Sequence, residues 1–115
     1  MTKLNDNQIE ILKRARENLQ ENANRKGYIY EFLCHQVIFA DLGIKEFPKH
    51  SGFGDLVSQC SQDAQALVSA IASAIKGSIS LELYIDRHAK VDYRKFSMLA
   101  RLAWLDKMIE SGVCA

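Results

Sequence analysis

The chain has 115 residues, of which 48% are hydrophobic and 25% are charged. This length can bury one hydrophobic core but not two, and the composition is too apolar for a disordered chain. Fifteen Lys and Arg residues against fourteen Asp and Glu residues leave a formal net charge of +1. The balance excludes binding to nucleic acid, membranes or acidic partners through overall charge, so such binding would need a local patch. We expect one helical domain over residues 1–115.

The first predicted helix begins near Asp6 and ends before Gly27. Asn5 and Gln8 have the spacing of a capping box, in which each side chain accepts a hydrogen bond from the other residue's backbone N–H. Beyond this start, apolar residues recur at steps of three and four, as they do on one face of a helix: Ile9, Leu12, Ala15, Leu19 and Ala23.

Residues 28–40 are predicted to form a buried central helix. Nearly all of them are apolar or aromatic, and the polar exceptions, Glu31, His35 and Gln36, fall roughly on one side of a helical wheel. A strand is the alternative, because Tyr, Ile, Phe and Val favour sheets. Helix is favoured, since the segment is long for a strand and lacks strict alternation. Gly43 ends this helix.

The main loop is predicted over residues 42–54, which hold the only proline and three of the six glycines. A helical turn over residues 55–60 follows. Ser61 then caps a further helix that ends at Gly77. The small side chains of this helix around Ala70 to Ala74 leave little to bury within a thin domain, so we expect a homodimer in which the helix packs against its symmetry mate.

The last part of the chain contains one ambiguous segment and one clear helix. Residues 78–88 alternate as a strand does but also suit a short helix, and helix is favoured because no second convincing strand is present. The final helix is capped by Asp92 and runs to Gly112, with apolar residues at helical spacing. The predicted fold is therefore all-α, a compact bundle of about four to five helices with one longer Gly- and Pro-containing loop over residues 42–54.

No pattern in the sequence predicts a catalytic, metal or cofactor site. Cys34 and His35 are adjacent, but neighbouring helix residues point about 100° apart, which favours a buried thiol over a nucleophile with its base. A thiol enzyme built on Cys34 is the reading set aside, and it predicts loss of activity on Cys34→Ser. The three cysteines form no CxxC pair, and no histidine spacing brings two onto one helical face. We therefore expect that the protein is not an enzyme and that it binds no metal and no cofactor.

The N-terminus and the apolar runs of the sequence argue against secretion and membrane insertion. The first residues hold no apolar stretch of the kind that a signal peptide requires, and no run approaches the roughly eighteen apolar residues of a membrane span. We therefore expect no membrane partner and a cytoplasmic location.

Two groups of residues are candidates for binding a macromolecule. Phe47 and Phe53 lie in the predicted loop, where they either fill gaps in the core or serve as exposed anchors for a protein partner. Arg87, Arg94 and Lys95 are the candidate phosphate contacts of the alternative, a small nucleic-acid-binding accessory protein. Acidic residues interleave with the cations, so nucleic acid is the less favoured partner.

Three stretches of the sequence resemble stretches that occur together in one group of known proteins. They are Ile-Leu-Lys-Arg-Ala-Arg-Glu at 11–17, Tyr-Ile-Tyr-Glu-Phe-Leu-Cys-His at 28–35, and Arg-Leu-Ala-Trp-Leu-Asp-Lys-Met-Ile at 101–109. Together they resemble small uncharacterised helical proteins of tailed bacteriophages and prophages. Those chains open on a helix, continue with a Cys-His helix and close on an Arg-x-x-Trp-(Leu/Ile)-Asp-x-(Leu/Met)-Ile helix.

The resemblance implies a phage origin and no catalytic residue, because the group has no agreed activity. In the closing motif, Arg101 and Trp104 are three residues apart and can share one edge of a helix, so both join Phe47 and Phe53 as candidate partner contacts. The resulting hypothesis is a non-enzymatic protein-interaction module. It would modulate or inhibit a host protein, such as a defence, transcription or replication factor, in the host cytoplasm.

Overall fold

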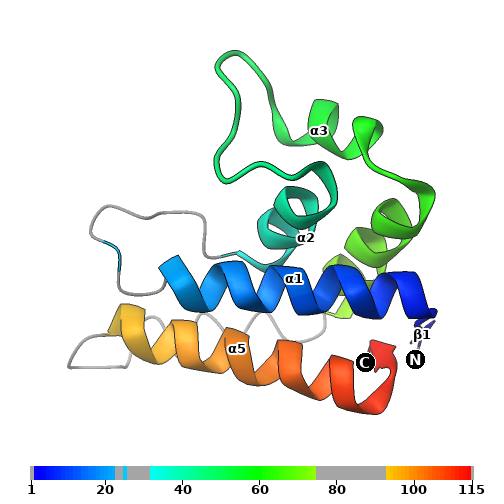
Figure 1. Ribbon diagram of the computed structural model, residues 1–115, viewed down its shortest axis with the longest axis vertical. Coiled ribbons are helices and arrows are strands. Elements are labelled where there is room, and N and C mark those ends of the chain that lie inside the picture. The colour runs from blue at the N-terminus through cyan, green and yellow to red at the C-terminus, as the bar shows by residue number, and fades with distance from the viewer. Residues whose placement is uncertain (1, 23–24, 26–31, 75–92, 115) are drawn as a thin grey trace.

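A computed structural model describes residues 2–22, 25, 32–74 and 93–114, with the backbone alone for residues 93–100. These residues form the predicted all-α fold, with a minor pairing of the chain ends as its only sheet within the described part (Figure 1). The elements, in chain order, are β1 (Thr2–Lys3), α1 (Asp6–Asn22), α2 (Leu33–Leu42), α3 (Phe53–Gln59), a helix over residues 62–74, α5 (Tyr93–Ser111) and β2 (Val113–Cys114).

The two longest described helices, α1 and α5, lie side by side and run in opposite directions (Figure 1). At one end of this pair, β1 and β2 join as an antiparallel ladder, with Thr2 opposite Cys114 and Lys3 opposite Val113. Helix α2 packs across α1, and α3 packs against α2 (Figure 1). Helix α2 therefore lies between the α1–α5 pair and α3 (Figure 1).

The start of α1 is the predicted capping box. The Asn5 N–H donates to Gln8 Oε1 at 2.9 Å, and the Gln8 N–H donates to Asn5 Oδ1 at 2.8 Å. Both side chains also bind Asp63, because Asn5 Nδ2 donates to its carboxylate at 2.9 Å and Gln8 Nε2 donates to its carbonyl at 3.1 Å. The cap of α1 therefore also joins this helix to the start of the 62–74 helix.

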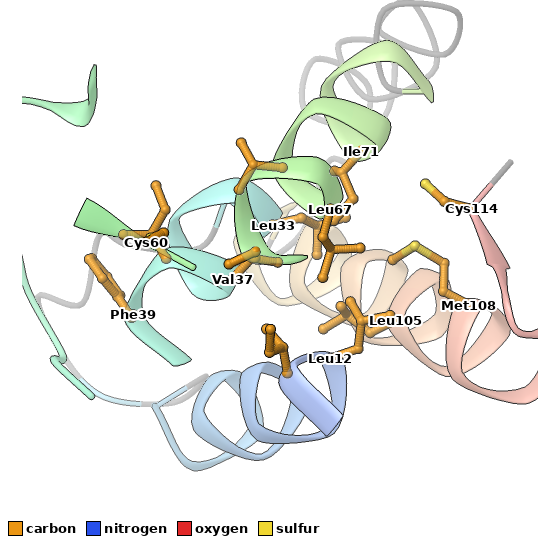
Figure 2. Close-up of a cluster of buried hydrophobic side chains, with 14 of the residues drawn as sticks. Leu12, Leu33, Val37, Phe39, Cys60, Leu67, Ile71, Leu105, Met108 and Cys114 are labelled. Atoms are coloured by element: carbon orange, nitrogen blue, oxygen red, sulfur yellow. The ribbon is translucent and has the colours of Figure 1, made fainter. Parts of the chain in front are cut away.

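The hydrophobic core is built from one face of each helix, and Leu12, Leu67 and Leu105 converge at its centre from three of them (Figure 2). Most of the predicted apolar stripe of α1 is fully buried, as periodicity requires of the helix face that meets the core. The largest side chains with less than 2% exposure are Phe39, Ile11, Leu12, Leu19, Leu33, Ile38, Leu56, Leu67, Ile71, Leu105 and Met108.

Glycine and serine end and begin the elements around the main loop. Gly43 adopts φ 70°, a left-handed conformation that suits glycine, and its N–H donates to the Phe39 carbonyl. Ser61 caps the 62–74 helix, since its Oγ accepts from the Ala64 N–H at 3.2 Å. The same hydroxyl donates to Asp41 at 2.9 Å, which ties the end of α2 to the start of that helix.

Several boundaries differ from the prediction or fall outside the described residues. The loop is shorter than 42–54, because α3 begins at Phe53 rather than at Asp55. The described part of the central helix begins at Leu33, and residues 26–31 lie outside the description. The segment 78–88 and Asp92 also lie outside it. The β1–β2 ladder was not predicted, since two residues per strand carry no periodicity.

Asn5→Ala should lower the free energy of unfolding by about 1 kcal/mol, because it removes the acceptor for the Gln8 N–H at the start of α1. Urea unfolding at neutral pH measures this change. Asn7→Ala is the matched control, since Asn7 donates to the same Asp63 carboxylate at 2.8 Å but caps nothing. Equal losses in the two variants would contradict the role of Asn5 as a cap.

Candidate functional site

The clearest surface feature is an aromatic patch made of Phe32, His35, Phe47 and Phe53. The centroid of the His35 ring lies 5.4 Å from that of Phe32, 4.9 Å from that of Phe47 and 5.9 Å from that of Phe53. Beneath them is the buried ring of Phe39, 6.3 Å from His35 and 5.3 Å from Phe47. His35 is therefore the centre of a cluster of four phenylalanine rings.

Three successive pieces of the chain bring these rings together. Phe32 is the residue before α2, and His35 and Phe39 follow it at steps of three and four, which puts all three on one helical face. Phe47 comes from the loop after α2, and Phe53 is the first residue of α3. The loop therefore folds back over the side of α2 that carries His35.

The patch combines fixed rings with exposed apolar surface. Among the described residues, the exposed large hydrophobic side chains are Phe32, at 52%, and Phe53, at 43%. The rings of Phe32 and Phe47 are nearly perpendicular to that of His35, the edge-to-face geometry that aromatic pairs prefer. Arg101 Cζ lies 5.3 Å from the centroid of Phe32, within cation–π range. These contacts hold Phe32 in place although half of it faces solvent.

Burial among the rings lowers the pKa of His35 below its ordinary value of 6.5. The cause is desolvation, because the imidazolium would lose more water than the neutral ring does. The neutral ring is therefore the form that the patch favours. A neutral imidazole packs among phenylalanine rings as another aromatic ring, so the patch favours an uncharged His35.

Two of the four candidate partner residues lie in this patch, and the other two lie outside it. The structure brings Phe47 and Phe53 together through His35. Arg101 is only 3% exposed and lies against the Phe32 ring, so it supports the patch from within. Trp104 is half-buried against the core, outside the ring cluster.

The structure does not describe the side chains of the candidate phosphate contacts. Arg87 lies outside the described residues, and Arg94 and Lys95 lie in the first turns of α5, where the structure describes the backbone. Phe32 and His35 were not predicted from the sequence as parts of a site. The available signal was their spacing of three residues next to the loop aromatics.

Two of the three cysteines, Cys60 and Cys114, lie in environments that disfavour the thiolate. Burial raises the pKa of Cys60 to about 11, with the Asp41 carboxylate nearby adding to the rise. Burial also raises the pKa of Cys114. The Cys34 thiol donates to the Val68 carbonyl at 3.9 Å. Among the described residues, no three His, Cys, Asp or Glu side chains are grouped as metal ligands, and none of the helices there has the length and apolarity to cross a membrane.

Comparisons with models of known protein families, with curated proteins and with solved structures give no match to this chain.

Lowering the pH from about 7 to about 5 should destabilise the fold through His35. Its pKa is lower in the folded state, so the unfolded chain takes up the proton first. The free energy of unfolding therefore falls as the pH drops below about 6.5 and levels off below the folded-state pKa. Urea unfolding across this range measures the slope, and His35→Phe, which keeps a ring but cannot titrate, should reduce it.

His50→Asn is the matched control for this pH dependence. His50 is exposed in the loop and has φ 68°, a left-handed conformation that asparagine tolerates. The Asp63 carboxylate, whose pKa is lowered by hydrogen bonds from Asn7 and Asn5, titrates below the range tested. A slope that survives in His35→Phe and disappears in His50→Asn would overturn the assignment.

Proposed function

We propose that this chain is a non-enzymatic protein-interaction module that docks on a protein partner through the aromatic patch. The observation that carries the proposal is the pair of exposed rings, Phe32 and Phe53, which both pack near the His35 ring. Exposed apolar side chains that gather in one place mark interaction sites more often than isolated ones do. In the same proposal the chain is phage-encoded, and its partner is a host protein that it modulates or inhibits.

The geometry of the patch suits tight binding because its rings are already ordered. A phenylalanine side chain offers a large apolar area with two rotatable bonds, and here neighbouring rings restrict both. Binding then loses little further side-chain entropy, which is a main cost of association. Aromatic anchors of this kind dominate the energetics of many interfaces.

Contacts join the three stretches that resemble phage proteins. Arg101, the first residue of the closing stretch, lies over the ring of Phe32 in the second stretch. Asp106, also in the closing stretch, accepts hydrogen bonds from the guanidinium of Arg16 in the first stretch. Residues from the three stretches are therefore in contact. The contact between Arg101 and Phe32 helps to position the aromatic patch.

Phe32→Ser and Phe53→Ser should each weaken capture of a host protein by about tenfold, the usual loss for an aromatic anchor. The measurement is an affinity pull-down from host lysate with the tagged chain, followed by titration of the captured protein. Lys49→Ser, an exposed change in the loop after α2, is the matched control. Equal capture by all three variants would exclude the patch as the docking surface.

The same pull-down, run at low and high salt with nuclease, tests the nucleic-acid alternative. Phosphate contacts release counterions, so binding through Arg94 and Lys95 would be lost at high salt. A mostly apolar interface keeps its partner under both treatments. Retention of a single protein supports docking, and loss under both treatments supports a nucleic-acid-binding accessory protein.

A homodimer through the 62–74 helix is a separate part of the proposal. Ser69, Ala72 and Ser73 are exposed on this helix, and their small side chains permit close approach of a second copy. Sedimentation equilibrium should show a dimer that Ala72→Arg dissociates. A monomer at high concentration would remove this part of the proposal and leave the aromatic patch unaffected.

A further inference from the structure

A small pocket is lined in part by Phe39, the buried ring beneath the aromatic patch. Its volume is about 200 Å³, and it is lined by Asn18, Phe39, Ala40, Gly43, Ile44 and Lys45. The first of these residues comes from α1, and the others come from the end of α2 and the segment just after it. The pocket shares with the patch only the buried ring beneath it, so it is a separate site.

The pocket has the size of a single small apolar group. Ligand pockets for drug-sized molecules start at about 300 Å³, whereas a buried cavity of about 150 Å³ takes up benzene, with its six carbons. Gly43 contributes backbone alone, and apart from its own atoms and those of its chain neighbours nothing lies within 4 Å of where its side chain would begin, so this side is open. A ligand of five or six carbons would fit with one end in solvent.

The walls are mainly apolar and are held by contacts outside the pocket. Phe39 is fixed against the Phe47 ring at 5.3 Å. The Asn18 amide is already engaged, because its Nδ2 donates to Gln36 Oε1 at 2.6 Å and its Oδ1 accepts from Asn22 Nδ2 at 3.2 Å. Asn18 is therefore a wall of the pocket, and Lys45 is the lining residue that can select the ligand's charge.

Lys45 is the one charged residue among those that line the pocket. It is exposed and forms no ion pair with another residue that the structure describes. The C-terminal end of α2 is close and carries about half a negative charge, but the ammonium carries a full positive one. In addition, the Phe39 carbonyl at this helix end already accepts hydrogen bonds from the N–H groups of Gly43 and Ile44.

We propose that this pocket binds a small aliphatic carboxylate, with its hydrocarbon against Phe39 and Ile44 and its carboxylate at the Lys45 ammonium. This site is additional to the proposed protein docking, and its test does not depend on that proposal. The hydrocarbon supplies most of the binding through removal of apolar surface from water. The exposed ammonium adds a modest preference for a negative charge.

Three probes of the same shape and different charge test the site: 4-methylpentanoate, 4-methylpentanamide and 4-methylpentylamine. Titration into the labelled protein, followed by the amide and methyl resonances of Gly43 and Ile44, should show weak, millimolar binding. The carboxylate should bind about threefold more tightly than the amide, and the amine should bind least. The absence of shifts at these residues up to the solubility limit, or equal binding of all three probes, would overturn the proposal.

Variants separate the hydrocarbon contact from the charge contact. Ala40→Leu fills the pocket from α2 and should abolish binding of all three probes. Lys45→Glu should reverse the order of carboxylate and amine, and Lys49→Glu, which changes a lysine outside the pocket, should leave the order unchanged. Thermal unfolding checks that each variant is folded, and the exposed Lys45→Glu tests the proposal even if Ala40→Leu is unstable. An unchanged order in Lys45→Glu would overturn the role of the ammonium.

N-Acetylleucine, as a fourth probe, distinguishes two sources of the same chemistry. Tighter binding than 4-methylpentanoate assigns the site to the carboxyl-terminal residue of a peptide, and weaker binding assigns it to a free acid. Phe32→Ser should bind all four probes as the unchanged protein does, since Phe32 does not line the pocket. The experiments therefore distinguish a failure of docking at the aromatic patch from a failure of the pocket to bind the probes.

Discussion

Burial of one face of α1 is the constraint on which the rest of the structure depends. Ile11, Leu12, Ala15 and Leu19 are completely inaccessible to solvent, and α1 contacts both α2 and α5. Their burial removes a continuous apolar stripe from water, which is the main favourable term in folding a small domain. The stripe also sets the position of α2, and through it the position of every ring in the aromatic patch.

Local patterns made most of the described fold predictable. The Asn5–Gln8 box, Gly43 and Ser61 each act through hydrogen bonds or backbone conformation within a few residues, so the sequence alone reveals them. The link from the α1 cap to Asp63 and the pairing of Thr2 with Cys114 join residues 58 and 112 positions apart. Such contacts follow from the packing of whole helices, which no short pattern encodes.

The candidate site was predictable in part. The loop position of Phe47 and Phe53 left open whether they fill gaps in the core or are exposed, and the structure places Phe53 exposed and Phe47 half-buried. Phe32 was taken for a buried helix residue, but the described helix starts at Leu33 and leaves the Phe32 ring half exposed. Arg101 was expected at the surface, yet tertiary packing turns it under that ring. Exposure depends on neighbouring elements, which explains both differences.

The pairing of β1 with β2 brings the two ends of the described chain to the same end of the molecule, well away from α3 (Figure 1). A short linker between the ends would therefore close the backbone without disturbing the helices, and new ends could be opened in the loop between α2 and α3. The fold is thus suited to circular permutation. It is equally suited to insertion as a unit into a surface loop of another protein, with α3 facing outward.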